Sequence, residues 1–232
     1  MSRMSHTSST LARRSCCPRC LRPQSACICD WIVPTRHGTE VLLLQHPLET
    51  GHAKGSARLL HLSLANSRLH VSEQFGEEQL RALLFAPFSP DAEPDVQPVL
   101  LYPDNAGTTT SGPHPTDSVG AYKDGRLRLV VLDATWRKSR KMLYLNPLLQ
   151  SLPRLALDRA PPSRYAIRKA HKPGQLSTYE AVCYALMQFE ADAERVRPLL
   201  AAFDGFVMQQ QRQQQGLAGV QAQRGATATA AE

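Results

Sequence analysis

Hydrophobic positions in this chain fall into short unbroken runs that alternate with segments of helical spacing. The unbroken runs predict strands over residues 40–47, 98–104 and 129–132, with shorter strands at 69–71 and 152–157. Helices are predicted over residues 54–62, 77–84, 136–145, 177–189 and 193–208. Apolar runs without polar alternation are typical of strands that are buried on both faces. The pattern therefore predicts an α/β fold, with a mainly parallel sheet that has helices on both faces.

Composition divides the 232 residues into four parts. Residues 1–15 are rich in Ser and Thr and are expected to be disordered, and residues 209–232 form a low-complexity tail. Between them lie a cysteine-rich module at 16–34 and a main domain at 38–208. No run of 18 apolar residues and no apolar segment after the first arginines occur. We therefore expect neither a membrane span nor a secretory signal, and a cytoplasmic location.

Five of the six cysteines fall within fourteen residues. Cys17 and Cys20 are separated by two residues, and Cys27 and Cys29 follow after a six-residue loop. In a cytoplasmic chain this spacing indicates a metal site rather than a set of disulfides, and four thiolates suit a tetrahedral structural Zn²⁺. Unligated or redox-active thiols are the alternative. A register that uses Cys16 instead of Cys17 stays open.

A carboxylate, a hydroxyl and a large aromatic side chain follow the strand at 129–132. Asp133 is at the carboxyl end of that strand, where open α/β sheets bind their ligands. Thr135 and Trp136 come next and begin a helix whose first turn contains Arg137 and Lys138. The helix dipole disfavours each such cation by about 0.3–1 kcal/mol. The arrangement favours an anion-binding site over the alternative, a solvated basic face.

Positive charge is concentrated in one part of the chain. Residues 126–172 contain twelve Lys and Arg against two acids, which gives this window +10 while the whole chain carries +7. Trp136, Tyr144 and Tyr165 lie in the same window and are expected to stack on unpaired bases. Such segregation of charge indicates a polyanionic partner such as a nucleic acid.

Two further cations flank a Gly/Ser turn at the start of the helix predicted over 54–62. Lys54 and Arg58 are placed where a helix N-terminus could hold an anion. The sequence contains neither a G-x-x-x-x-G-K-[ST] loop nor a G-x-G-x-x-G fingerprint after a strand. A Walker A nucleotide site and a Rossmann dinucleotide site are thereby excluded.

Five short elements occur in order along residues 17–190. They are the four cysteines, Gln45-His46-Pro47-x-Glu49 with Lys54 and Arg58, Leu101-Tyr102-Pro103, Asp133-Ala134-Thr135-Trp136 with Arg140-Lys141-Met142, and Ser177-Thr178-x-Glu180-Ala181. This order resembles the DTW-domain family of tRNA-uridine aminocarboxypropyltransferases, which is related to the SPOUT superfamily. The D-x-T-W stretch is short, but the shared order of five elements makes the resemblance specific.

The resemblance implies a reaction and a fold. The family transfers the 3-amino-3-carboxypropyl group of S-adenosylmethionine to N3 of a uridine in tRNA and releases methylthioadenosine. SPOUT-like folds bind this donor in a knotted region at strand ends, largely through backbone groups. The residues expected to form the donor site here are Leu101, Tyr102, Pro103, Leu132, Arg168, Ser177, Thr178 and Glu180.

The same resemblance and the basic window together indicate the RNA-binding residues. We expect these to be Lys54, Arg58, Arg137, Lys138, Arg140, Lys141, Tyr165 and Lys169. One departure from the family affects the donor site, because the family shows Tyr-Arg-x-Arg where this chain has Tyr165-Ala166-Ile167-Arg168. The donor carboxylate is therefore assigned to Arg168 or Lys54.

Asp133, Thr135 and Trp136 are the candidate catalytic residues. Asp133 either takes the proton from uridine N3 or only orients the base. Thr135 caps its helix or contacts the donor, and Trp136 lines the pocket, stacks on uracil or packs in the core. A SPOUT-type RNA methyltransferase and a zinc-containing RNA-binding protein without enzymatic activity are the alternative functions. SPOUT relatives are often dimers, so a homodimer is compatible with the sequence.

Overall fold

The fold is built on a five-stranded parallel sheet with the strand order β2-β1-β4-β3-β5. The computed structural model describes residues 15–89, 95–103, 126–157, 160–165, 176–190 and 192–229, with side chains described up to residue 216. The strands are β1 (Glu40–Gln45), β2 (Ser67–Val71), β3 (Val96–Leu101), β4 (Arg126–Asp133) and β5 (Arg154–Leu155). The prediction of a parallel sheet is confirmed.

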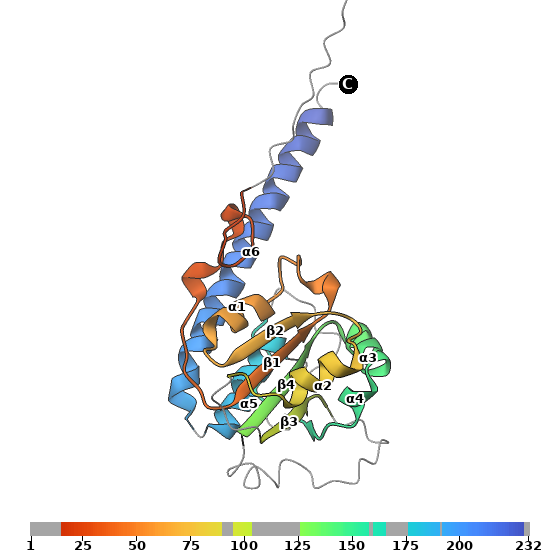
Figure 1. Cartoon of the computed structure of the whole chain (residues 1–232). Coiled ribbons are helices and arrows are strands. Elements are labelled where there is room, and N and C mark those ends of the chain that lie inside the picture. Colours follow the sequence, from red (N-terminus) through yellow and green to blue (C-terminus); the bar gives the residue numbers. More distant parts are fainter. Residues whose placement is uncertain are drawn as a thin grey trace, which may run out of the picture.

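Helices cover both faces of this sheet (Figure 1). The long helices are α1 (Ala57–Ser63), α2 (Glu77–Phe85), α3 (Trp136–Leu145), α5 (Thr178–Phe189) and α6 (Ala193–Thr229). The short ones are η1 (Gln24–Ala26), η2 (Cys29–Trp31), η3 (Pro47–Glu49) and α4 (Pro147–Gln150). Helices α1, α5 and α6 pack on one face, and α2, α3 and α4 pack on the other. No helix in these described parts is both long and apolar enough to cross a membrane.

The two cores explain why the central strands lack polar alternation. In β1, Val41 and Leu43 face the α1–α5–α6 core, whereas Leu42 and Leu44 face the α2–α3–α4 core. All four side chains are fully buried. A strand that is covered on both faces must be apolar at successive positions, which is the pattern seen in the sequence.

The amino ends of β1 and β4 hold a buried ion pair. Arg128 is fully buried, donates from Nε to Glu40 Oε2 at 2.8 Å, and donates to the carbonyls of Leu83 and Ala86, both at 2.7 Å. Arg126 also bonds Glu40, at 2.5 Å. These two cations of the basic window are therefore both paired with Glu40, at the end of the sheet opposite Asp133.

Several elements differ from the sequence-based expectation. Strand β3 begins at Val96 and includes Pro98, which is tolerated because pairing with β5 begins only at Leu100. Helix α4 was not expected at all.

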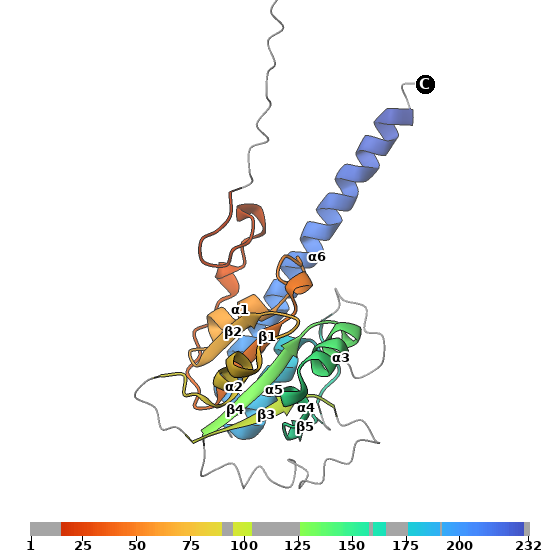
Figure 2. The same ribbon diagram turned by 45° about the vertical axis from the view of Figure 1, so that its right-hand side comes forward.

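Helix α6 continues to Thr229 and projects from the body (Figure 2), although the sequence predicted helix only to residue 208. Gln and Ala, which dominate this extension, are good helix formers. Disorder was expected for residues 1–15, and residues 1–14 lie outside the described part of the chain.

The cysteine-rich module packs on α6 through an aromatic side chain. Trp31 Nε1 donates to Gln209 Oε1 at 2.5 Å, and Gln209 Nε2 donates to the Cys27 carbonyl at 2.8 Å. The indole ring lies directly against Gly205, where an added Cβ would be 2.1 Å from Trp31 Cζ3. Only glycine allows this close approach of the module to the helix.

Replacement of Gly205 by alanine is expected to destabilise the protein. The methyl group would overlap the Trp31 ring, and overpacking of this kind costs about 1–3 kcal/mol. The free energy of unfolding, measured in urea, tests this. Gly216→Ala is the matched control, because nothing lies within 4 Å of its added Cβ, and alanine in an exposed helix should be neutral or stabilising. Equal effects of the two changes would contradict the packing described here.

Candidate functional site

A cavity of about 330 Å³ opens at the carboxyl ends of β3, β4 and β5. Its floor is formed by strand-end residues, and its walls are formed by the first turns of α3 and α5. The lining residues are Leu101, Tyr102, Pro103, Val131, Leu132, Ala134, Trp136, Ser139, Leu155, Leu157, Leu176, Ser177, Thr178 and Ala181. This volume and this largely apolar lining are typical of sites for small organic ligands.

The structure brings most of the predicted donor residues to this one cavity. Leu101, Tyr102 and Pro103 line it from β3, Leu132 lines it from β4, and Ser177 and Thr178 line it from the start of α5. Arg168 lies outside the described residues. Sequence reasoning missed Ser139, Leu155, Leu157, Leu176 and Ala181, and their apolar or small side chains gave no signal.

Glu180 does not line the cavity, which corrects the expectation of a direct donor contact. Its side chain is fully buried and accepts hydrogen bonds from Ser163 Oγ at 2.8 Å, from Arg164 N at 2.6 Å and from both N and Oγ of Ser177 at 2.9 and 2.7 Å. Ser177 Oγ accepts in turn from Glu180 N, which completes the predicted capping box. Glu180 thus anchors the 163–165 segment to the helix that forms one wall.

Two aromatic rings form the wall next to α3. Trp136 and Tyr102 meet edge to face, with ring centroids 5.5 Å apart and an interplanar angle of 67°. Ser139 Oγ donates to the Trp136 carbonyl at 3.1 Å, so the Tyr102 hydroxyl, 3.1 Å away, donates to Ser139. Trp136 remains 39% exposed, at the rim of the cavity. Thr135 Oγ1 accepts from Lys138 N at 3.4 Å and caps α3.

Asp133 lies beside the cavity without lining it. Its side chain is 4% exposed, and its Oδ2 accepts a hydrogen bond from Gln45 Nε2 at 2.8 Å. Its neighbours in sequence, Leu132 and Ala134, both line the cavity. Gln45 is the register partner of Asp133 across the β1–β4 pair. The contact joins residues 88 positions apart, and no local sequence pattern predicted it.

His46 connects the end of β1 to α3 through an acidic residue. Its Nδ1 accepts from Leu48 N at 3.1 Å, so Nε2 carries the hydrogen of the neutral ring and donates to Glu73 Oε1 at 3.0 Å. The other carboxylate oxygen of Glu73 bonds Lys141 Nζ at 2.9 Å. Hydrogen bonds from Lys141 and from His46 hold the pKa of Glu73 below its usual value.

Lys138 is also paired with an acid from outside the basic window. Its Nζ lies 2.8 Å from Oε1 of the buried Glu49. Two of the four expected RNA-binding cations of α3, Lys138 and Lys141, are thus engaged within the protein. In the part of the chain that the structure describes, Arg137 and Arg140 are exposed and form no ion pair.

The exposed cations of α3 share one face with an aromatic side chain. Arg137, Arg140 and Tyr144 are spaced at i, i+3 and i+7, which places them on the same side of a helix. Tyr144 is 79% exposed. Trp136, at the start of the same helix, connects this face to the cavity rim.

Two other expected RNA contacts, Tyr165 and Arg58, are engaged in contacts within the protein. Tyr165 is buried, packs on Phe203 with ring centroids 5.2 Å apart, and donates its hydroxyl to the Lys54 carbonyl. It would have to leave the core to stack on a base, which corrects that expectation. Arg58 Nη2 donates to the Arg19 carbonyl at 2.8 Å and so braces the cysteine-rich module. Lys169 lies outside the described residues.

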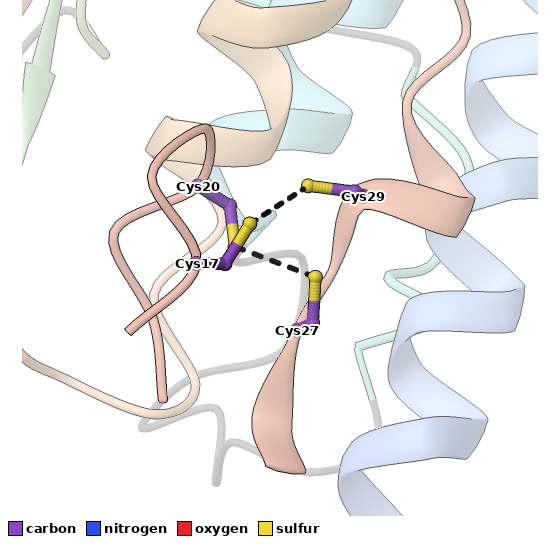
Figure 3. Close-up of side chains that lie close together, drawn as sticks. All are labelled: Cys17, Cys20, Cys27 and Cys29. Atoms are coloured by element: carbon purple, nitrogen blue, oxygen red, sulfur yellow. Dashed lines mark hydrogen bonds between the residues drawn. The ribbon is translucent and has the colours of Figure 1, made fainter. Parts of the chain in front are cut away.

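The four cysteine sulfur atoms converge in the N-terminal module (Figure 3). The Sγ atoms of Cys17 and Cys29 are 3.6 Å apart, those of Cys20 and Cys27 are 3.8 Å apart, and all four lie within 4.8 Å of one another. A tetrahedral ion with Zn–S bonds of about 2.3 Å needs sulfur atoms about 3.8 Å apart, so the four residues fit Zn²⁺.

The structure also bears on which cysteine belongs to this cluster. Cys17 takes part, while Cys16 is exposed and outside it. Hydrogen bonds from the backbone N–H groups of Cys20 and Arg19 lower the pKa of Cys17 to about 6, which favours the thiolate that binds metals.

Comparison with known proteins places this site in a family. The DTW domain family matches residues 14–211. The chain belongs to the DTW-domain family. Over 199 residues it is 28% identical to tRNA-uridine aminocarboxypropyltransferase 2 of Drosophila melanogaster, a match that covers 81% of this chain and 73% of the relative.

Two further relatives carry similar names. The chain is 29% identical to tRNA-uridine aminocarboxypropyltransferase 2 of Mus musculus, over 77% of this chain and 57% of that protein. It is 25% identical to tRNA-uridine aminocarboxypropyltransferase A of Arabidopsis thaliana, over 79% of this chain and 76% of that protein. No solved structure matches significantly.

The cysteine geometry predicts which thiols are needed for metal binding. Cys17→Ala should abolish the bound zinc of the purified protein, because three thiolates and no fourth ligand remain in the cluster. Cys16→Ser is the matched control and should retain one equivalent. Metal content measured by plasma mass spectrometry distinguishes the two. Retention of zinc by Cys17→Ala, with its loss from Cys16→Ser, would mean that Cys16 is the ligand.

Proposed function

We propose that this protein transfers the 3-amino-3-carboxypropyl group of S-adenosylmethionine to N3 of a uridine in tRNA. The main observation behind this proposal is the cavity at the carboxyl ends of β3, β4 and β5. Asp133 lies beside this cavity, and the Arg137–Tyr144 face of α3 lies at its rim. Membership of the DTW-domain family and the names of the relatives support this assignment.

The donor is proposed to occupy the cavity. The apolar strand ends and the rings of Tyr102 and Trp136 suit the adenine and the carbons next to sulfur. Arg168 is our candidate for the donor carboxylate, as the family pattern implies. The start of α5, with Ser177 and Thr178 in the lining, adds the positive end of a helix dipole to the cavity wall.

The chemistry requires a proton acceptor and correct positioning. Uridine N3 is a poor nucleophile while it is protonated, and we propose that the Asp133 carboxylate takes this proton. The N3 lone pair then forms a bond to the propyl carbon attached to sulfur. The carbon–sulfur bond breaks, and its electron pair leaves with neutral methylthioadenosine. Because a sulfonium is a good leaving group, most of the rate enhancement comes from in-line positioning.

Three finer features belong to the same proposal. Cys17, Cys20, Cys27 and Cys29 are proposed to hold a structural Zn²⁺, which orders the N-terminal module. The knotted SPOUT-like topology stays a proposal, since residues 104–125 and 166–175 lie outside the described part. The proposed partner is tRNA and the proposed location is the cytoplasm.

Nucleoside mass spectrometry of a reconstituted reaction tests the function. Purified protein, S-adenosylmethionine and unmodified tRNA should give a uridine that carries an aminocarboxypropyl group, together with methylthioadenosine. Asp133→Asn should lose this product and retain tRNA binding. A methylated nucleoside with S-adenosylhomocysteine would identify a methyltransferase instead. Binding of tRNA without any modified product would indicate a binding protein.

Filling the cavity should block the donor selectively. Ala181 lines the cavity from α5, and Ala181→Leu adds three carbons to that wall. The Kd for S-adenosylmethionine, measured by calorimetry, should rise at least tenfold while tRNA affinity is unchanged, because Ala181 belongs to α5 and not to the α3 face. Ala201→Leu, on the exposed side of α6, is the matched control and should bind the donor normally. Unchanged donor binding by Ala181→Leu would place the donor elsewhere.

Charge reversal on α3 should weaken tRNA binding. Arg137→Glu with Arg140→Glu replaces the two exposed, unpaired cations of this helix, and each lost phosphate contact lowers the slope of log K against log salt by about one. Arg195→Glu with Arg197→Glu on α6, on the other face of the sheet, is the charge-matched control. Filter binding at several salt concentrations measures both effects. An unchanged slope would exclude this face as the tRNA contact.

A further inference from the structure

Two buried polar side chains meet at the carboxyl ends of the two central strands. Gln45 is 6% exposed and Asp133 is 4% exposed, and they are register partners in the parallel β1–β4 pair. The Gln45 amide donates to Asp133 Oδ2 at 2.8 Å. A buried carboxylate loses its hydration, so each hydrogen bond that it receives within the protein strongly restricts its orientation.

The backbone of the same two strand ends is also fixed. His46 N donates to the Asp133 carbonyl at 3.0 Å, and Ser72 N donates to the Gln45 carbonyl at 3.1 Å. The main chain at Asp133 is thus held by His46, and one carboxylate oxygen is held by Gln45. Both contacts help to hold the carboxylate beside the cavity edge formed by Leu132 and Ala134.

The chemical type of the donor suits a proton acceptor. A cation bonded to a carboxylate lowers its proton affinity much more than a neutral amide does, and an amide does not titrate. The lysines of the adjacent helix α3 are directed to other acids, since Lys138 bonds Glu49 at 2.8 Å and Lys141 bonds Glu73 at 2.9 Å.

We propose that Gln45 is a positioning residue, which holds the Asp133 carboxylate in the orientation that accepts the proton of uridine N3. This inference rests on the transferase function proposed above. In the reaction, Asp133 gains the proton, N3 gains the bond to carbon, and sulfur keeps the electron pair of the broken bond. Gln45 exchanges no proton and only maintains the geometry of the acceptor.

The first variant removes the donor. Gln45→Leu puts an apolar side chain of similar size at the strand end, and this side chain cannot donate to Asp133. We expect kcat to fall on the order of 10²-fold, as is typical when a reacting group is misplaced by about 1 Å. The KM for S-adenosylmethionine and the KM for tRNA should be unchanged, because Gln45 lines neither the cavity nor the α3 face.

A second variant separates positioning from folding. Gln45→Glu combined with Asp133→Asn keeps a buried carboxylate–amide hydrogen bond but moves the carboxylate to the neighbouring strand. Its melting temperature should match that of the wild type, whereas its kcat should stay as low as that of Asp133→Asn alone. If the pair were purely structural and Asp133 were not the proton acceptor, restoring the hydrogen bond would restore activity.

The outcomes are distinguishable. Full activity of Gln45→Leu, or restored activity of the exchanged pair, overturns the positioning role while the wild-type product still supports the transferase function. A wild-type protein that forms no aminocarboxypropyl-uridine overturns the transferase function and this inference with it. A loss of kcat at unchanged KM in Gln45→Leu, with a stable but inactive exchanged pair, supports the inference.

Discussion

The pairing of β1 with β4 is the interaction on which the candidate site depends. Both strands are apolar on both faces between their ends, so hydrophobic burial alone would not distinguish one register from the next. Polar partners at the two ends do so: Glu40 pairs with Arg128, and Gln45 pairs with Asp133. A slip of one residue would leave a buried ion pair broken, at a cost of about 3–5 kcal/mol. The same constraint that fixes the sheet therefore places Asp133 next to the cavity.

The cysteine-rich module is part of the support for the main domain. Arg22 donates to the carbonyls of Ala53 and Gly55 at 2.7 and 2.5 Å, and its guanidinium lies 5.4 Å from the centroid of the Phe206 ring. The loop thus held includes Lys54, whose carbonyl accepts from the Tyr165 hydroxyl. Ordering of the module by a metal would therefore stabilise the loop before α1 and the segment that leads towards the donor site.

The charge counted along the sequence differs strongly from the charge that the folded protein exposes. The window from 126 to 172 contains two acids, but acids from distant segments neutralise many of its cations. These acids are Glu40, Glu49, Glu73 and Asp204. Within α3, the exposed cations without an ion pair in the described part of the chain are thus Arg137 and Arg140, and Tyr144 lies on the same helix face.

The sequence by itself determined the α/β class, the positions of the main strands and helices and the cysteine cluster, because burial on two faces and metal spacing leave local patterns. It also indicated most of the cavity residues at strand ends, through the family resemblance. Only the tertiary structure decided that Tyr165 and Glu180 are internal supports and that Gln45 holds Asp133. The hydrogen bonds of Glu180 with Arg164 and of Gln45 with Asp133 join residues that are 16 and 88 positions apart, so no local pattern encodes them. Tyrosine occurs both in cores and at surfaces, so its residue type alone did not predict that Tyr165 is buried.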